Sequence, residues 1–238
     1  TKRVEALAVS GVFSPISDEQ ELLVEELARE ALGKDFPVTR SREIGSIGLI
    51  ERENAAVLNA AIRSLAQKAY GAFQNVLAAH GIRAELFITQ NDGTLMSIEY
   101  AKRYPVLTIA SGPTNSLRGA AFLSGLKNAI VVDVGGTTTD VGVLTNGFPR
   151  ESSSAVQMGG VRTNFRMPDL VSIGLGGGSL VDLEATPPVV GPRSVGFRIT
   201  TEALVFGGKT LTASDVAVAG GMARLGDPAR VRGVDARR

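Results

Sequence analysis

The sequence predicts a mixed α/β fold. Short apolar runs that suit buried strands alternate with stretches of helical periodicity through the first half of the chain. Two tight-turn patterns, at residues 135–138 and at Asn146-Gly147, then separate apolar runs and predict two consecutive hairpins. The 238 residues are 44% hydrophobic, so the chain can bury a core in one large or two modest domains.

The N-terminal part predicts a strand, a helix and a second strand. The apolar run 4–13 suits a buried strand, and PVTRS (37–41) suits a shorter one. Between them, Ser17 and Gln20 form a capping-box pattern at the start of a helix, and Gly33 stands where a helix often ends. We expect the apolar residues at helical spacing to face the core: Leu23, Leu27 and Ala31.

A long amphipathic helix is predicted from about residue 52 to residue 79. Its apolar positions alternate at intervals of four and three, which places them on one face: Leu58, Ile62, Leu65, Ala69, Ala72 and Val76. Strands are then expected at 85–90 and 106–111, on either side of a short helix within 96–104 that Pro105 stops. This part of the chain therefore predicts alternating strands and helices.

Another helix is predicted at 113–126, where Pro113 occupies the first turn. The strand 129–134 follows and leads into the first hairpin. After residue 150 the chain is rich in Gly, Ser and Thr, and helical periodicity returns only near residue 213. Either Thr212 or Ser214 is expected to cap this last helix.

Composition excludes several classes of function. The formal net charge is +1, from 25 Lys and Arg against 24 Asp and Glu, and aromatics make up only 5%. We therefore expect no nucleic-acid partner, and no membrane partner because no apolar run has spanning length. The chain has no cysteine, and its one histidine, His80, ends a predicted helix. Thiolate catalysis, Ser-His triads and zinc hydrolysis are thereby excluded, and a cytoplasmic location is expected.

The stretch VVDVGGTTTD (131–140) carries the clearest chemistry. Gly135 and Gly136 lack side chains, so backbone N–H groups can approach an anion closely. Three hydroxyl groups follow, those of Thr137, Thr138 and Thr139. Asp133 and Asp140 flank the loop, and two carboxylates beside a phosphate make electrostatic sense only with a divalent cation between them. The pattern predicts a polyphosphate site with Mg²⁺; a polar hairpin turn without a ligand is the alternative.

The order of motifs resembles the actin–Hsp70–sugar kinase superfamily and, within it, the hydantoinase/oxoprolinase family. The matching segments are ERENAAVLNAAI (51–62), QNDGTL (90–95), SGPTNSLRGAA (111–121), VVDVGGTTTDVG (131–142), VRTNFRMPDLVSIGLGGGSLV (161–181), GPRSVG (191–196) and GGKTLTASDV (207–216). The resemblance implies an actin/Hsp70-like, or ribonuclease H-like, mixed sheet flanked by helices, with a hairpin phosphate loop. It also implies the remainder of a first lobe at 1–127, with 113–126 connecting the lobes, and a second lobe at 128–238.

The function that this resemblance implies is ATP-dependent, ring-opening hydrolysis of a cyclic amide such as a hydantoin or 5-oxoproline; relatives carboxylate ketones. Asp133 and Asp140 would be the catalytic residues and the Mg²⁺ ligands, with Asp133 ordering the metal or the attacking water. Gly135, Gly136 and Thr137 would hold the β/γ-phosphates. Thr138 and Thr139 would also belong to the cofactor site, and Thr139 and Asp140 would close the loop. Phosphorylation turns the amide oxygen into a leaving group, and the loop would supply positioning and charge neutralisation. A second hydantoinase-type subunit and a homo-oligomer are implied partners.

The segment GLGGGS (174–179) has more than one interpretation. The resemblance assigns three of its glycines to nucleotide contact, Gly176, Gly177 and Gly178. It also imitates a dinucleotide fingerprint, but Ser179 replaces the third glycine and no helix follows. The alternative is a glycine-rich bend that another backbone approaches closely. A second segment, FGGKT (206–210), partly matches a Walker phosphate-binding loop but lacks its first glycine. It predicts a turn with a solvated Lys209.

One expected motif is absent. The family carries another acidic-glycine phosphate loop on its first lobe, and residues 1–127 contain none. We therefore expect this chain to be a fragment with about half of an interlobe ATP site, and weak or no ATP turnover on its own. Two other functions stay open: a kinase-like or regulatory nucleotide-binding relative, and a non-catalytic assembly subunit that keeps the loop for structural reasons.

Overall fold

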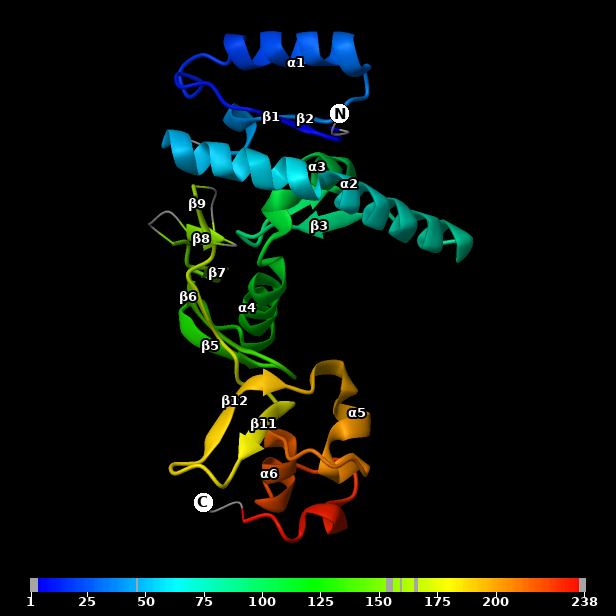
Figure 1. Cartoon of the computed structure of the whole chain (residues 1–238), viewed down its shortest axis with the longest axis vertical. Helices are drawn as coiled ribbons and strands as arrows, with labels where there is room; N and C mark the ends of the chain where they lie inside the picture. The colour runs from blue at the N-terminus through cyan, green and yellow to red at the C-terminus, as the bar shows by residue number, and fades with distance from the viewer. Residues whose placement is uncertain (1–3, 46, 153–155, 159, 165–166, 236–238) are drawn as a thin grey trace. The chain divides into compact units, whose positions relative to one another are not determined.

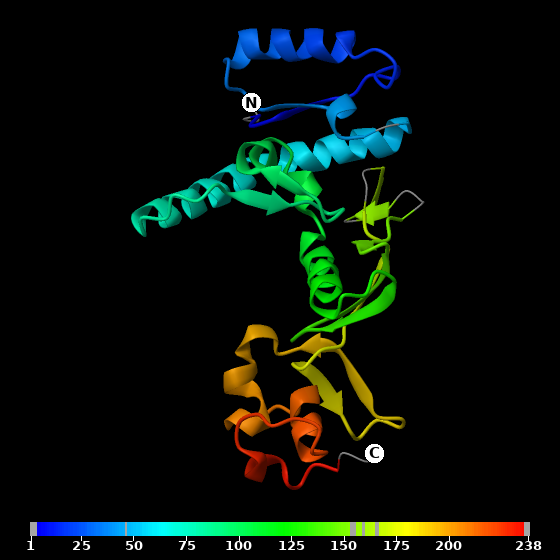
Figure 2. The ribbon, with the colours of Figure 1, turned by 180° about the vertical axis from the view of Figure 1, so that it is seen from behind.

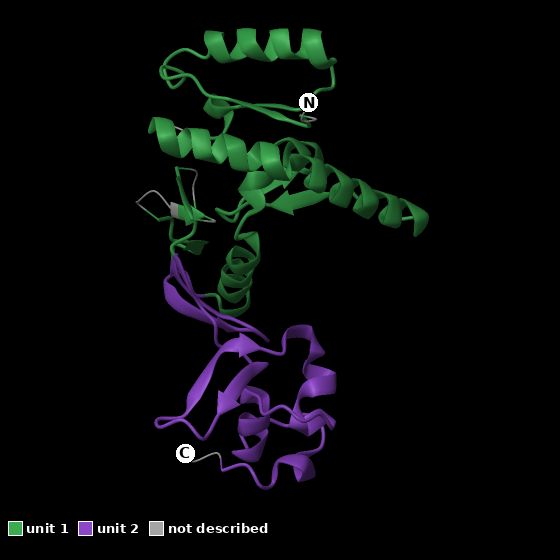
Figure 3. Ribbon diagram, viewed as in Figure 1, with its two compact units in different colours: residues 1–125, 145–169 green, residues 126–144, 170–238 purple. Residues whose placement is uncertain are grey.

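The computed structural model describes residues 4–45, 47–152, 156–158, 160–164 and 167–235, which belong to two compact units (Figure 3). The first unit comprises 1–125 and 145–169, and the second comprises 126–144 and 170–238. The segment 145–169 thus belongs to the first of these compact units. No helix in the described ranges is long and apolar enough to cross a membrane.

The first unit begins with a β–α–β arrangement (Figures 1 and 2). The strands β1 (Leu7–Val9) and β2 (Val38–Arg40) are parallel, and α1 (Glu19–Leu32) connects them. A parallel pair requires such a crossover. Of the strand predicted over 4–13, only the three residues of β1 form a strand. Gly33 ends α1 with a φ of 111°, which confirms its predicted position.

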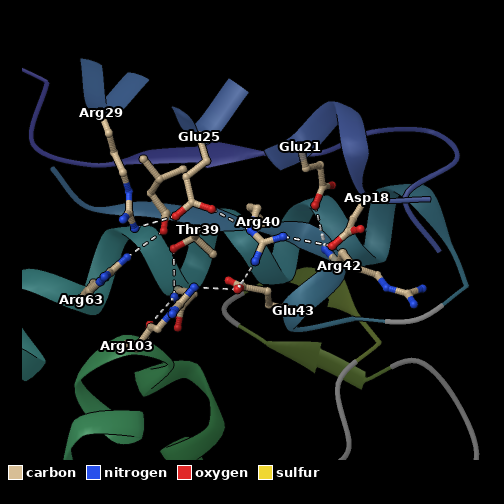
Figure 4. A network of polar contacts seen from close by, with 12 residues as sticks. Asp18, Glu21, Glu25, Arg29, Thr39, Arg40, Arg42, Glu43, Arg63 and Arg103 are labelled. Carbon is tan, nitrogen blue, oxygen red and sulfur yellow. Dashed lines mark hydrogen bonds and ion pairs between the residues drawn. The ribbon is translucent and has the colours of Figure 1, made fainter. Parts of the chain in front are cut away.

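The predicted start and buried face of α1 are wrong. Asp18, not Ser17, is the N-cap residue, and its carboxylate accepts a hydrogen bond from Arg40 at 3.0 Å instead of capping the helix. The predicted core residues Leu23, Leu27 and Ala31 are exposed. Glu21 and Glu25 are buried in their place. The residues that lie beside α1 present arginine and hydroxyl groups, and only polar side chains can form ion pairs or hydrogen bonds with them (Figure 4).

The long helix α2 (Leu49–Ala79) confirms the predicted amphipathic segment, but only its first half is in the core. Leu58 and Ile62 pack against a cluster that contains Ala55. Four later members of the predicted stripe are exposed: Leu65, Ala69, Ala72 and Val76. Among the described elements, the core therefore packs against the N-terminal turns of α2. Sequence periodicity alone does not reveal which turns of a helix are covered.

The rest of the first unit is built from short elements. They are β3 (Phe87–Thr89), β4 (Leu95–Ser97), α3 (Ile98–Arg103), α4 (Ser111–Ser124), β7 (Phe148–Pro149), β8 (Val156–Met158) and β9 (Val161–Thr163). The strand predicted at 106–111 is wrong, since residues 105–108 form a 3₁₀ turn. Val106 is fully buried in the core, and its N–H donates to the Asn59 Oδ1 at 3.2 Å. A short apolar run fits a buried turn as well as a buried strand.

An antiparallel sheet in the second unit carries the first hairpin. Its strands are β5 (Ala129–Val134), β6 (Thr139–Thr145) and β10 (Leu170–Ile173), in the order β10–β6–β5. One face of the sheet bears apolar side chains that are exposed: Ile130, Val132, Val134, Val171 and Ile173. After β6, Asn146 and Gly147 have positive φ values of 54° and 80°. Both angles match a type I′ turn, which confirms the second predicted hairpin turn.

The C-terminal part of the second unit is a hairpin packed with short helices. Strands β11 (Ser179–Asp182) and β12 (Val189–Ser194) pair antiparallel. The helices are α5 (Ile199–Glu202) and α6 (Ala213–Ala219), with 3₁₀ turns at 196–198, 204–206 and 228–231. Their common core contains Ala203, Val205, Val218 and Val231.

The start of α6 confirms one of the two predicted caps. Thr212 is the N-cap residue and forms a capping box with Asp215. The Asp215 side chain is fully buried. It accepts hydrogen bonds from the backbone N–H groups of Val205 at 2.7 Å, Leu204 at 3.3 Å and Thr212 at 2.8 Å. This carboxylate therefore joins α6 to the turn at 204–206.

We expect Asp215→Ala to destabilise the second unit by about 3 kcal/mol, because three buried backbone donors lose their acceptor. Urea unfolding followed by circular dichroism measures this change. Glu184→Ala, at an exposed position of the same unit, is the control and is expected to change stability by less than about 0.5 kcal/mol. Equal unfolding midpoints for the two variants would contradict the assignment.

Candidate functional site

The turn between β5 and β6 exposes a set of hydrogen-bond donors. The N–H of Gly135 donates to the Thr138 carbonyl at 2.8 Å and closes the turn. Residues 135–138 are all exposed. The N–H groups of Gly136, Thr137 and Thr138 make no hydrogen bond within the described ranges, and neither do the hydroxyls of Thr137 and Thr138. The turn can therefore offer backbone and hydroxyl donors to an anion.

Two carboxylates lie side by side where the hairpin leaves this turn. Asp133 of β5 and Asp140 of β6 are register partners, so their side chains project from the same face of the sheet. On β5, this face is opposite to the one that bears Ile130, Val132 and Val134, as the alternation of a strand requires. Like charges directly opposite each other are unfavourable unless a cation lies between them.

The surroundings of the two carboxylates differ. Ser172 of β10 is the register partner of Asp140 on the other side, and its hydroxyl donates to the Asp140 Oδ1. The carboxylate of Asp133 makes no hydrogen bond or ion pair with any residue in the described part of the chain. Sequence reasoning missed Ser172. The sequence shows that it is the one polar residue in the strand LVSI, but it does not show that Ser172 pairs with Asp140.

The donor set fits Mg²⁺ bound together with phosphate. Mg²⁺ is usually held by one or two carboxylates, with water and substrate phosphate oxygens completing its ligands. Asp133 and Asp140 provide the carboxylates, and the exposed turn can hold the phosphates. Within the described ranges, no three acidic or histidine side chains gather as a metal site. The arrangement thus differs from a closed metal site made by protein ligands alone.

A glycine bend, residues 175–178, packs directly against the turn. The N–H groups of Gly177 and Gly178 donate to the carbonyls of Gly135 and Gly136 at 3.0 and 2.7 Å. The hydroxyl of Thr139 donates to the Leu175 carbonyl at 2.7 Å. The interpretation of GLGGGS as a bend approached by another backbone is therefore confirmed. The segment continues into the strand β11, not into a helix, which is incompatible with a dinucleotide fingerprint.

Other residues that the sequence drew attention to lie outside this arrangement. Asp92 accepts a hydrogen bond from the Thr94 N–H at 2.9 Å and serves as a turn former. Lys209 is exposed beside Gly207, whose φ of 96° marks a turn. Two arginines of the matched segment 161–181 could hold a substrate carboxylate or lie in solvent. The first, Arg162, forms an ion pair with Glu51 at 3.4 Å, and the second, Arg166, lies outside the described residues.

Comparison with known proteins identifies relatives along most of the chain. The family model described as Hydantoinase/oxoprolinase matches residues 52–224. The acetophenone carboxylase gamma subunit of Aromatoleum aromaticum is 32% identical over 224 residues, which cover 90% of this chain and 30% of that protein.

Two solved structures share the fold. The crystal structure of the ATP-dependent caprolactamase from Pseudomonas jessenii matches 94% of this chain and 33% of that chain, with a TM-score of 0.74 and 26% identity. The nucleotide-free structure of acetone carboxylase, from work on ATP-dependent acetone carboxylation, matches 96% of this chain and 34% of that chain, with a TM-score of 0.65 and 26% identity. The chain thus spans about a third of the length of each of these proteins.

Proposed function

Since the chain belongs to the hydantoinase/oxoprolinase family and has its α/β, actin/Hsp70-like fold, we propose that residues 131–140 bind ATP with Mg²⁺ in an enzyme that hydrolyses a cyclic amide. One observation carries the proposal: an exposed, donor-rich turn stands beside two register-paired carboxylates. The description of a caprolactamase relative as ATP-dependent supports both the nucleotide and the amide.

Each group in the hairpin has a defined task in this proposal. The N–H groups of Gly136, Thr137 and Thr138, with the hydroxyls of Thr137 and Thr138, hold the β- and γ-phosphates. The carboxylate of Asp133 has no hydrogen-bond or ion-pair partner among the described residues and can hold the metal or orient a water. The Ser172 hydroxyl keeps the Asp140 carboxylate in place as the second metal ligand. Bound Mg²⁺ would neutralise charge between the phosphates and the two carboxylates.

The reason for using ATP lies in the substrate. An amide carbonyl is a poor electrophile, and transfer of the γ-phosphoryl group to its oxygen makes the carbon open to attack by water. Phosphoryl transfer needs in-line positioning and charge neutralisation more than covalent help from the protein. A rigid hairpin with fixed donors and paired acids meets those needs.

A carboxylase is the second candidate, because the relative with 32% identity is a carboxylase subunit. Its description as a gamma subunit also supports a further subunit as a partner of the protein that contains this chain. The same phosphate loop serves either reaction, so the substrate distinguishes them.

The test is ATP turnover by the natural protein that contains this chain, purified with any subunit that co-purifies. We expect Mg²⁺-dependent ATP hydrolysis that 5-oxoproline, a hydantoin or a lactam stimulates at least about tenfold. Stimulation by a ketone with bicarbonate, and not by any cyclic amide, would favour the carboxylase. ATP binding without turnover under all conditions would favour a regulatory or assembly role, and absence of ATP binding would refute the nucleotide site.

A further inference from the structure

We infer that Gly176 is a positioning residue that shapes the phosphate loop from behind, without touching the nucleotide. This inference rests on the proposed nucleotide site and concerns how its donors are held. It gives the glycine bend a role different from the direct nucleotide contact that the family resemblance implies for Gly176, Gly177 and Gly178.

The first argument is the space at Gly176. A Cβ atom at this position would lie 2.6 Å from the Thr137 nitrogen, and 2.7 Å from both the Gly135 oxygen and the Gly136 carbonyl carbon. All three neighbours are backbone atoms of the phosphate loop, which cannot swing aside as a side chain can. The φ of Gly176 is not in the left-handed region. The position therefore requires glycine for close approach, not for backbone conformation.

The second argument is the direction of the loop's peptide groups. The carbonyls of Gly135 and Gly136 both accept hydrogen bonds from the bend. In a trans peptide unit, the N–H points opposite to the carbonyl of the same unit. The N–H groups of Gly136 and Thr137 belong to those two units and therefore point away from the bend. The bend thus fixes two successive donors toward the side on which a phosphate can bind.

The third argument is that the bend is itself held firmly. The Gly176 N–H donates to the buried Ser179 hydroxyl at 2.9 Å. The N–H of Ser214, in the first turn of α6, donates to the Gly177 carbonyl at 2.8 Å, and the Val195 N–H donates to the Gly178 carbonyl at 2.9 Å. A platform tied to α6 and to the end of β12 can hold the loop in one conformation before ATP arrives. Such preorganisation is what makes fixed dipoles effective toward phosphate charge.

The test compares two alanine variants in the natural protein that contains this chain. Gly176→Ala places a methyl group against the loop backbone. Gly174→Ala is the matched control, because its Cβ would overlap the Pro192 Cβ at 2.9 Å and no loop atom. We measure the Kd of a fluorescent ATP analogue with Mg²⁺, the KM for ATP and for the second substrate, and hydrogen exchange of the peptide that spans 131–140.

The expected result is a rise of at least tenfold in Kd and KM for ATP in Gly176→Ala, with faster exchange in the loop and an unchanged KM for the second substrate. Gly174→Ala is expected to stay within twofold of the wild type in ATP affinity. If Gly176→Ala does not fold, Thr139→Val replaces it, since it removes the hydrogen bond to Leu175 and is expected to raise Kd in the same direction.

The two proposals fail in different ways. Wild-type ATP affinity and loop exchange in Gly176→Ala, beside a wild type that binds ATP, would overturn the positioning role alone. A wild type that binds no ATP would overturn the proposed function. A loss of affinity equal in Gly176→Ala and Gly174→Ala would show general destabilisation and also overturn the positioning role.

Discussion

Replacing Asp133 with asparagine in the natural protein that contains this chain is expected to lower the kcat for ATP hydrolysis by about 100-fold or more. The variant keeps the shape of the side chain but removes the negative charge that would hold Mg²⁺. Since the Asp133 carboxylate makes no hydrogen bond or ion pair within the described ranges, the change breaks no polar side-chain contact there. Steady-state ATP turnover at several Mg²⁺ concentrations measures the effect, and circular dichroism verifies that the variant is folded.

Two further variants separate this effect from a general loss of negative charge. Ser172→Ala is expected to lower turnover by only about tenfold, because it removes one hydrogen bond to the second carboxylate and leaves both charges in place. Glu184→Gln, at an exposed acid of the same unit, is expected to leave turnover unchanged. If Asp133→Asn kept more than a third of the wild-type kcat, the catalytic role of the hairpin would be wrong.

The hairpin could be predicted from sequence because its determinants are local. The turn residues and the apolar runs on both sides lie within a dozen positions, and the turn sets the register that pairs Asp133 with Asp140. Ser172 could not be assigned in the same way, since its pairing with Asp140 depends on a strand that returns about thirty residues later. The glycine bend could be predicted only in part. Its composition predicts that another backbone segment approaches it closely, but only the fold shows that this segment is the turn at 135–137.

The errors in the first unit have a common physical origin. Periodicity shows which residues share a helix face but not which face meets the core. In α1, the leucines were expected inside, whereas Glu21 and Glu25 are buried. Glu25 pairs with Arg40, and Glu21 accepts hydrogen bonds from the Ser41 hydroxyl and the Arg42 N–H. These partners come later in the chain, and no local pattern predicts them.

Arg40 is the centre of the charged network beneath α1 (Figure 4). Its guanidinium forms ion pairs with Glu43 at 2.6 Å, Glu25 at 2.8 Å and Asp18 at 3.0 Å. Burial alone would lower the pKa of Arg40, but the nearby carboxylates, Glu43 foremost, raise it above the ordinary value. Arg103 extends the network to α3 through Glu43 at 2.7 Å. Ion pairs therefore link α1, β2 and α3 where an apolar core was expected.

Glu21 occupies a neighbouring buried position and depends on its charge. Its Oε1 accepts from the Gly11 N–H at 2.9 Å and the Ser41 hydroxyl at 2.5 Å, and its Oε2 accepts from the Arg42 N–H at 3.1 Å. The Arg52 Nε donates to the same Ser41 hydroxyl at 2.9 Å. Burial acting alone would raise the pKa of Glu21, but the hydrogen bonds, that of Ser41 foremost, outweigh it and hold the pKa below the ordinary value of 4.5.

Glu21→Gln is therefore expected to destabilise the first unit by about 3 kcal/mol at neutral pH, since an amide NH₂ would face a buried N–H or O–H donor. Because the folded-state pKa is lowered, the Glu21 carboxylate stabilises the fold above pH 4.5, and this stabilisation is lost as pH falls below that value. Urea unfolding from roughly pH 7 to pH 3 measures both effects. The wild type should lose stability with acidification and Glu21→Gln should lose less, while Glu26→Gln, on the exposed side of α1, should follow the wild type. A parallel pH dependence in Glu21→Gln and wild type would mean that the charge of Glu21 does not hold α1 to Gly11, Ser41 and Arg42.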